Sequence, residues 1–407
     1  MRITGQIKEE ILTTAIRARV RHMMRKHTLG LKFLSLLFCP LLIACLPAIA
    51  APAPARRCVR THKRTAATTS GVPTFADSAK DDVTANDDPL VRQAAVMGLG
   101  RYNGSVVAID PSNGRILSIV NQKLAFSTGF KPCSTIKPVI ALAALEEGFI
   151  TRDTLIRVTR RKSLNLAEAL AHSNNPYFEE LGRRMGFEVV SSYARLLGLG
   201  ELAGYEISEE QTGAVPGEAP IRGGVARMSS FGEGIQMTPL QLGALASTFA
   251  NGGTLYYLQY PRTVEEKENF EPRIKRTLLI ETPLSDVRDG MLAAVEHGTA
   301  RRSYVLDGEQ EAGKTGSCSD AGSRLGWFVS FAGQENRKIV LVILVRGHSK
   351  KVQGPMAAGI AGHIYRQLHG ENYFAEQSIK SGGEKSASME SAAHFRKALE
   401  KSSSDQQ

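Results

Sequence analysis

Residues 131–138 read KPCSTIKP, and together with two later stretches this segment decides the fold. Ser134 and Lys137 are three positions apart, so a helix that starts here would place the lysine amine beside the serine hydroxyl. A serine hydroxyl is a weak nucleophile that needs a base within hydrogen-bonding distance. Lysine can be that base if burial or a second cation lowers its pKa. The spacing alone is a weak indication, because a helix-capping serine followed by a solvated lysine has the same pattern.

A second candidate element occupies residues 173–175, at a break between two predicted helical stretches. Ser173 and Asn175 are two positions apart on this loop, where both side chains could face one cleft. The hydroxyl could relay a proton, and the amide could bind a substrate carbonyl. Because residues 163–165 have the same Ser-x-Asn pattern, only the position along the chain separates the two.

A third candidate element comprises Lys314, Thr315, Gly316 and Ser317, just before a predicted pair of late strands. A glycine in a strand lets a substrate backbone approach closely. Lysine and hydroxyl groups can hold a carboxylate. Residues 380–382 repeat the pattern as Lys-Ser-Gly but lie in a polar tail without strand character, so we interpret the earlier stretch as the functional one.

Short β-rich runs flank a helical middle. Strands are predicted at 105–110, 115–120, 326–332 and 338–346, and helices at 135–147, 166–171, from 178 onward, 239–250 and 356–368. Pro-Ser-Asn-Gly at 111–114 predicts a hairpin between the first two strands. The expected fold class is α/β of the α+β type, an antiparallel sheet of N- and C-terminal strands flanked by helices.

The three elements occur in a characteristic order. Ser-x-x-Lys on a helix, Ser-x-Asn between helices and Lys-Thr-Gly on a late strand are typical of penicillin-binding proteins and class A β-lactamases. From about residue 103 to 370 the chain resembles the penicillin-binding protein transpeptidase domain. Further matching segments are residues 230–234, 237–242, 298–300 and 327–329. The resemblance implies a β-lactamase-like or transpeptidase-like fold.

The resemblance also implies a role for each candidate residue. Ser134 would be the acylated nucleophile, Lys137 its base, Ser173 the proton relay to the leaving amine and Asn175 the partner of the substrate amide. The backbone N–H groups of Ser134 and Ser317 would form an oxyanion hole, in which one donor is typically worth ~100- to 1000-fold in rate.

On the late strand, the resemblance implies that Lys314, Thr315 and Ser317 hold the substrate carboxylate, while Gly316 lets the substrate backbone approach. Lys314 and Lys137 would converge on one pocket, where each disfavours a charge on the other. Only one of the two needs to be neutral. No cofactor and no metal ion are expected.

The five cysteines fall into two groups. Cys133 precedes the candidate nucleophile and Cys318 follows the late motif, on elements that adjoin in this family. Some class A β-lactamases have a disulfide at this pair of positions, so the resemblance implies a disulfide here, with two free buried thiols as the alternative. Cys39, Cys45 and Cys58 lie outside the expected domain, and no cysteine spacing predicts a zinc site.

The activity implied by the resemblance is D,D-transpeptidation of peptidoglycan stem peptides, with β-lactams as covalent inhibitors and cell-wall synthesis proteins as candidate partners. A D,D-carboxypeptidase or a β-lactamase would share the acylation step and pass the acyl group to water. Class A β-lactamases activate that water with a Glu ahead of a Leu-Asn pair between the second and third motifs. Here the Leu-Asn pair, residues 164–165, comes before Ser173. A non-enzymatic β-lactam sensor is a further alternative.

The formal net charge of +11 is carried by residues 1–64, which hold 13 Lys and Arg against two Glu. The rest of the chain is electrically balanced, so no nucleic-acid partner is expected. An apolar run at residues 33–50 follows the basic segment, as in an export signal or a membrane anchor. Cleavage at 48–50, lipid attachment at 42–45 and an uncleaved span all stay open, as does translation from Met23 or Met24. The Lys/Arg excess before the run predicts export to the periplasm or to the outer face of the inner membrane.

The chain is thereby divided into five segments. They are a basic segment at 1–32, a signal peptide or anchor at 33–50, a flexible linker at 51–95, a transpeptidase-like domain at 96–372 and a disordered polar tail at 373–407.

Overall fold

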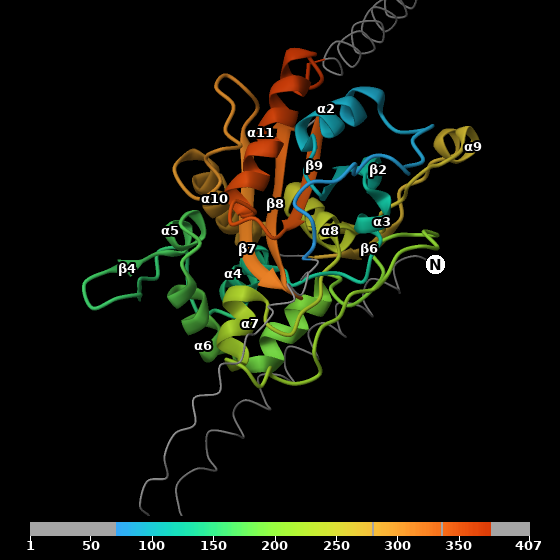
Figure 1. Ribbon diagram of the computed structural model, residues 1–407. Coiled ribbons are helices and arrows are strands. Elements are labelled where there is room, and N and C mark those ends of the chain that lie inside the picture. Colours follow the sequence, from blue (N-terminus) through green and yellow to red (C-terminus); the bar gives the residue numbers. More distant parts are fainter. Residues whose placement is uncertain (1–70, 279–280, 335–336, 376–407) are drawn as a thin grey trace, which may run out of the picture. The chain divides into compact units, whose positions relative to one another are not determined.

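Five antiparallel strands form the central sheet of the computed structural model, which describes residues 71–278, 281–334 and 337–375. Their spatial order is β2-β1-β9-β8-β7. The strands are β1 (Gly104–Asp110), β2 (Arg115–Val120), β7 (Glu311–Asp320), β8 (Ser323–Gln334) and β9 (Arg337–Gly347). Because β1 pairs with β9, strands from the two ends of the domain meet inside one sheet, as the sequence predicts (Figure 1).

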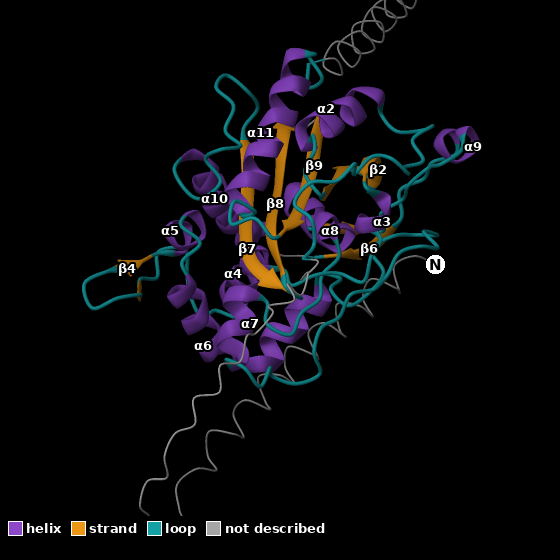
Figure 2. Ribbon diagram, in the orientation of Figure 1, coloured by secondary structure: helices purple, strands orange, loops and turns teal. Residues whose placement is uncertain are grey.

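Both faces of the sheet are covered by helices, so β9 is buried without interruption from residue 339 to 345. Helices α2 (Pro89–Leu99) and α11 (Gly354–Gly370) cover one face, while α4 (Lys137–Glu146) and α8 (Pro239–Ala250) pack on the other (Figure 2). The alternation along a strand divides the core accordingly: Val107 and Ile109 face α4 and α8, whereas Val106 and Ala108 face α2 and α11. Fully burying one such Val or Ile contributes about 1.5–3 kcal/mol.

The other elements surround this sandwich. The remaining helices are α3 (Gln122–Ala125), the 3-10 turn η1 (Cys133–Ile136), α5 (Leu166–Ala171), α6 (Asn175–Leu196), α7 (Gly224–Phe231), α9 (Val264–Glu268) and α10 (Glu281–Glu296). There are two small two-stranded sheets. One pairs β3 (Ile156–Arg157) with β4 (Ser163–Leu164), and the other pairs β5 (Thr254–Tyr256) with β6 (Ile274–Thr277). The sequence predicted the late strand pair at 326–332 and 338–346 and a late strand for the Lys-Thr-Gly motif; the structure extends the pair and has this motif on β7, which pairs with β8.

Residues 71–95 differ from the sequence expectation, which assigns them to a flexible linker. They pack on the domain, and α2 begins with Pro89 after Asp88, whose carboxylate accepts a hydrogen bond from Val91 N at 3.0 Å. Asp82 accepts a hydrogen bond from Asn121 N at 2.9 Å and forms a 2.9 Å ion pair with Arg92. The contacts of Asp82 join distant parts of the chain, so the composition of the segment gave no sign of them, whereas Asp88 and Pro89 form a local helix start.

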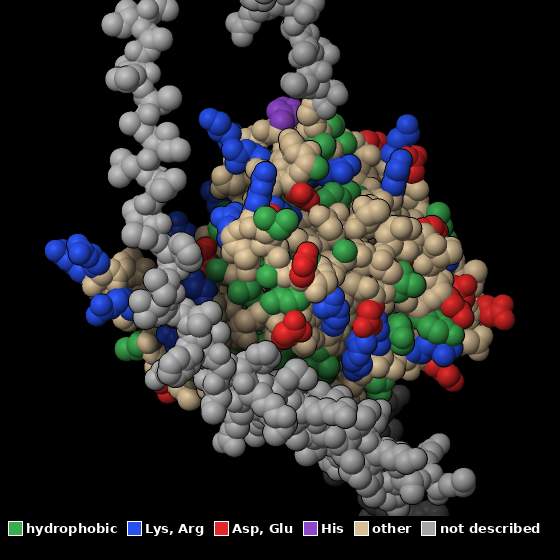
Figure 3. All heavy atoms as spheres, turned by 90° about the horizontal axis from the view of Figure 1, so that it is seen from below, with side chains coloured by type: hydrophobic (Ala, Val, Ile, Leu, Met, Phe, Trp, Pro, Cys, Tyr) green, Lys and Arg blue, Asp and Glu red, His purple; other side chains and the backbone are tan. Residues whose placement is uncertain are grey.

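Several sequence expectations concern residues outside the described ranges. These are the basic segment at 1–32, the signal peptide or anchor at 33–50, the linker up to residue 70 and most of the polar tail. Within the ranges that are described, no helix combines the length and apolar character needed to cross a bilayer. Figure 3 shows acidic and basic side chains interspersed over one face of the domain, as expected from its balanced charge.

A buried carboxyl group on β7, that of Glu311, makes the stability of this fold depend on pH. Burial raises the pKa of Glu311 on β7 from 4.5 to about 7. The folded state therefore holds this proton more tightly than the unfolded chain, and the side chain lowers the free energy of unfolding as the pH rises from 4.5 through 7. At pH 8 the full cost is about 3 kcal/mol.

We expect Glu311→Gln to raise the free energy of unfolding by about 3 kcal/mol over the wild type at pH 8 and by little at pH 4.5. Urea denaturation at both pH values measures the gain. Glu309→Gln, two residues away on a partly exposed position, serves as the control. A difference between Glu311→Gln and the wild type that does not change with pH would contradict the prediction.

Candidate active site

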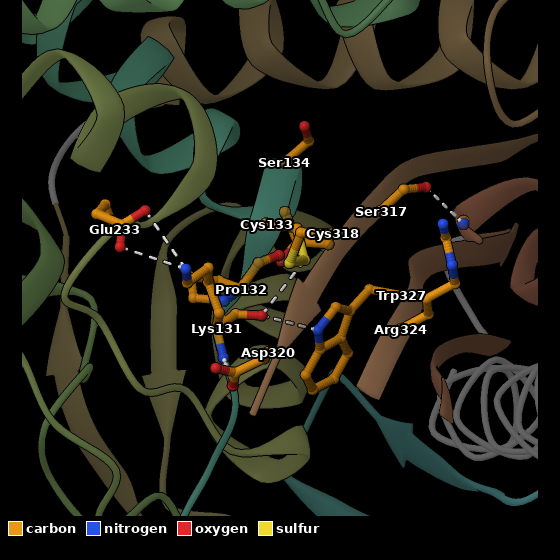
Figure 4. The surroundings of a disulfide bond; sticks show 12 residues. Lys131, Pro132, Cys133, Ser134, Glu233, Ser317, Cys318, Asp320, Arg324 and Trp327 are labelled. Atoms are coloured by element: carbon orange, nitrogen blue, oxygen red, sulfur yellow. Dashed lines mark hydrogen bonds and ion pairs between the residues drawn. A yellow bond between two sulfur atoms is a disulfide. The ribbon is translucent and has the colours of Figure 1, made fainter. Parts of the chain in front are cut away.

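The segment that carries Ser134 begins as the 3-10 turn η1 and continues as α4 from Lys137, rather than as a single α-helix from residue 135. Two side chains of the sheet hold the backbone of Lys131, just before this turn. The Lys131 carbonyl accepts a hydrogen bond from Trp327 Nε1 at 3.0 Å, and the Lys131 N–H donates to Asp320 Oδ2 at 3.1 Å (Figure 4). The Ser134 turn is therefore fixed to both β7 and β8.

A disulfide joins Cys133 on this turn to Cys318 on β7, with the two Cα atoms 5.7 Å apart. This is the bond that the family resemblance implies. In Figure 4 the bond lies beneath Ser134, whose hydroxyl points away from it. Gly316 helps the two elements to approach, since a Cβ atom there would lie only 3.0 Å from the Pro132 carbonyl oxygen.

Removing this disulfide should destabilise the domain. The bond closes a loop across 185 residues, and a cross-link of that length restricts the unfolded chain strongly. We expect the double variant Cys133→Ala/Cys318→Ala to lose about 2–5 kcal/mol in urea denaturation under oxidising conditions. Reductant should destabilise the wild type and leave the double variant unchanged. Equal stability of the oxidised wild type and the variant would refute the expectation.

The Lys137 amine is the centre of the site. Its Nζ lies 2.9 Å from Ser134 Oγ, 3.1 Å from Ser173 Oγ and 2.6 Å from Asn175 Oδ1. It also lies 2.9 Å from the Ser173 carbonyl oxygen. The first two sequence motifs are thus brought together around one amine. Four oxygen atoms surround an amine that has three protons at most. When Lys137 is neutral, its nitrogen has a lone pair that can accept the proton of a neighbouring hydroxyl.

The surroundings favour the neutral form of Lys137. Its side chain is buried, and burial, with the charge of Lys314 second, holds the pKa of Lys137 well below its ordinary value. Glu179 acts in the opposite direction. Burial also lowers the pKa of Lys314 to about 7. The sequence analysis expected the two lysines to disfavour each other's charge, and for Lys137 this interaction is present.

The third motif lies on β7, which is an edge strand of the sheet. Lys314 is buried and donates to the Thr315 carbonyl oxygen at 3.1 Å. The Thr315 hydroxyl lies 2.7 Å from that of Thr299. Ser317 is more exposed, and its Oγ accepts a hydrogen bond from Gly354 N at 2.7 Å at the start of α11. The Ser317 hydroxyl can still donate its own proton to a ligand.

Two residues near the amine were missed by the sequence analysis. The Phe178 ring lies under Lys137, with Nζ 5.5 Å from its centroid, and the charge of Glu179 acts on the same amine. Both follow Asn175 by three and four positions on α6, and so lie on the same face of this helix. Helical spacing counted from Asn175 could have identified them. Thr299 was noted only as part of a family-like segment.

Two residues of the site have backbone conformations that L-amino acids rarely adopt. Cys133 and Ser173 both have φ of 53°, in the left-handed region. Each such residue costs on the order of 1–3 kcal/mol and persists when its surroundings hold it in place. Cys133 is held by its disulfide, and Ser173 by two contacts to Lys137.

Comparison with known proteins places this geometry in context. The chain is 28% identical to Stage V sporulation protein D of Bacillus subtilis (strain 168) over 310 residues. This alignment covers 64% of this chain and 48% of that protein. It is 25% identical over 364 residues to the peptidoglycan D,D-transpeptidase PbpA of Mycolicibacterium smegmatis, covering 70% and 72%. This chain therefore spans about half the length of the Bacillus relative.

Solved structures share the fold. The transpeptidase domain of penicillin-binding protein 3 from Burkholderia pseudomallei superposes with a TM-score of 0.59 at 22% identity, covering 69% of this chain and 92% of that one. The predicted fold class is thus confirmed. A family model described as the penicillin binding protein transpeptidase domain matches residues 104–366, which include all three motifs. The chain belongs to the family of penicillin-binding protein transpeptidase domains.

Proposed function

We propose that this protein is a serine D,D-transpeptidase that cross-links peptidoglycan stem peptides through an acyl-enzyme on Ser134. The observation that carries the proposal is the buried Lys137 amine in hydrogen-bonding contact with Ser134, Ser173 and Asn175. Several relatives are named peptidoglycan D,D-transpeptidases, which supports the same activity.

In the acylation step, neutral Lys137 accepts the Ser134 proton as Oγ attacks the penultimate carbonyl carbon of the stem peptide. The backbone N–H groups of Ser134 and Ser317 stabilise the oxyanion. When the tetrahedral intermediate collapses, the carbon–nitrogen bond breaks, and Ser173 passes a proton from Lys137 to the leaving amine. The terminal D-amino acid departs and leaves an ester on Ser134.

The substrate lies along β7 in this proposal. An edge strand offers unpaired backbone groups to an extended peptide, which can join the sheet as an added strand. Lys314, Thr315 and Ser317 then hold the terminal carboxylate, which also raises the charged fraction of Lys314. The Asn175 amide holds the substrate backbone beside the scissile bond.

In the second step, the amine of a neighbouring stem peptide attacks the ester carbonyl and gives up a proton to Lys137. Ser134 recovers its proton as it leaves, and the new peptide bond is the cross-link. A β-lactam follows the first step, because its ring amide is attacked in the same way, but its amine stays tethered. We propose that these reactions take place outside the cytoplasmic membrane, after export directed by the basic and apolar segments at 1–50.

Hydrolysis of the same acyl-enzyme is the second candidate, because Glu179 is the acidic group whose charge acts on the Lys137 amine. Its carboxylate accepts a 3.4 Å hydrogen bond from Ser230 and pairs with Arg183 at 3.5 Å. These contacts occupy it in the present structure. A carboxylate free of them could activate a water molecule, which would make the enzyme a carboxypeptidase or β-lactamase.

The two activities can be separated by one competition experiment. The full-length protein is given a pentapeptide ending in two D-amino acids, together with an excess of a free D-amino acid as the acceptor. Mass spectrometry then measures exchange against hydrolysis. Exchange in excess of hydrolysis is expected. Predominant hydrolysis that disappears in Glu179→Gln would establish the hydrolase, and no turnover with no penicillin label would overturn the proposal.

A further inference from the structure

Two histidines and a glutamate converge at the junction of two segments that flank the active-site cluster. Glu168 belongs to α5, His172 ends this helix, and His297 follows α10. His172 directly precedes Ser173, and His297 lies two residues before Thr299, which contacts the third motif. Helices α5 and α10 lie side by side in Figure 1.

The donor atoms of these side chains have the spacing of a metal site. Glu168 Oε2 lies 3.3 Å from His172 Nε2, and Glu168 Oε1 lies 3.5 Å from His297 Nε2. All three residues offer one donor atom each within 4.8 Å of the others. Zinc–ligand bonds of about 2.0–2.1 Å at tetrahedral angles hold donor atoms roughly 3.4 Å apart. The two imidazoles lie against different oxygens of Glu168, and a shared ion would draw the three donor atoms from within 4.8 Å to this closer spacing.

The backbone on both sides of the cluster is already fixed. Thr299 N donates a hydrogen bond to the Ala171 carbonyl oxygen at 3.0 Å, which ties the two segments together. Gly298 makes this contact possible, since a Cβ atom there would lie 2.2 Å from the same oxygen. Glu168 and His172 are four residues apart and share one face of their helix. Little backbone freedom would be lost on binding an ion, which favours affinity.

We propose that Glu168, His172 and His297 form a zinc-binding site, a further site that neither the sequence motifs nor the proposed reaction requires. Two imidazoles and one carboxylate suit Zn²⁺ better than Mg²⁺ or Ca²⁺, which prefer oxygen ligands. The three side chains are partly exposed, so water completes the coordination. The ion joins the segment that ends in Ser173 to the segment that carries Thr299, and so stabilises their relative position.

The alternative is a pair of surface His–Glu contacts without a metal, and zinc binding by the full-length protein distinguishes the two. Equilibrium dialysis against ZnCl₂ compares the wild type with His172→Ala/His297→Ala. The matched control is His363→Ala/His369→Ala, two exposed histidines of α11. We expect the first double variant to bind one zinc ion fewer, or to bind it at least about tenfold more weakly, and the control to match the wild type.

Three further measurements distinguish the proposed site from a folding defect and from zinc bound by Cys39, Cys45 or Cys58. Glu168→Gln keeps the side-chain shape and should weaken binding in the same way. Co²⁺ bound at the proposed site gives visible absorption without the thiolate charge-transfer band that cysteine ligands produce. Zinc should raise the thermal midpoint of the wild type and of the control only. Equal zinc stoichiometry, affinity and thermal shift in the wild type and all variants would overturn the proposal.

Discussion

Replacing Ser134 by alanine should abolish covalent labelling by a fluorescent penicillin and reduce peptide exchange by at least about 10³-fold. In the proposed mechanism the acyl ester forms on the Ser134 hydroxyl, which Lys137 Nζ contacts at 2.9 Å, and alanine removes that oxygen without adding bulk. Gel fluorescence after denaturation measures the label, and mass spectrometry of the digested protein locates it.

The matched control for this variant is Ser319→Ala, an exposed serine further along β7. It should label at the wild-type rate. Thermal unfolding of Ser134→Ala should stay close to that of the wild type, because the change removes one hydroxyl oxygen and adds no atom. Equal labelling of Ser134→Ala and wild type would show that another residue is acylated.

Replacing Lys137 by methionine should separate activity from stability. We expect the rate of acylation by penicillin to fall by about 10²- to 10⁴-fold, since the base that accepts the Ser134 proton is lost. The free energy of unfolding should remain within about 1 kcal/mol of the wild type or exceed it. Methionine fills the same space and removes an amine whose charged form burial disfavours, which offsets the lost hydrogen bonds.

The pH dependence of the same variant tests whether Lys137 is the base. In the wild type the acylation rate should rise as the pH increases through the lowered pKa of Lys137, because only the neutral amine accepts a proton. Lys137→Met should lose this rise. Lys123→Met, at an exposed position of α3, should keep both the rate and the pH profile. A normal pH rise in Lys137→Met would assign the base elsewhere.

The sequence predicted the fold well where local pattern and tertiary structure agree. The hairpin across Pro111 to Gly114 and the helix at 239–250 form as expected, and Thr238 caps this helix through a 3.1 Å hydrogen bond from Gln241 N. The segment at 71–95 was not predicted: Asp82 meets Asn121 only in the folded chain, and the local helix-start signal of Asp88 and Pro89 was overlooked. The sequence of such a segment looks like that of a linker.

The candidate site was predicted by the order of three short motifs, each too common to be informative alone. Two features were beyond this reasoning. The convergence of Glu168 and His172 with His297 joins residues from distant parts of the chain, so no local spacing predicts it. The burial of Lys137, which lowers its pKa, depends on packing against Phe178 and the surrounding core rather than on the residues of the motif.

The position of β9 between β1 and β8 has a consequence for how the chain folds as it is made. Val106 on β1 pairs with Ile343 on β9, so the first strand waits for its partner while more than 200 residues are synthesised, roughly 10–50 s at cellular rates. Until then the β1–β2 hairpin has an unpaired edge that can join another nascent chain. A domain of such high contact order should fold late and slowly, and a ribosome stalled before residue 337 should release an aggregation-prone product rather than a smaller working enzyme.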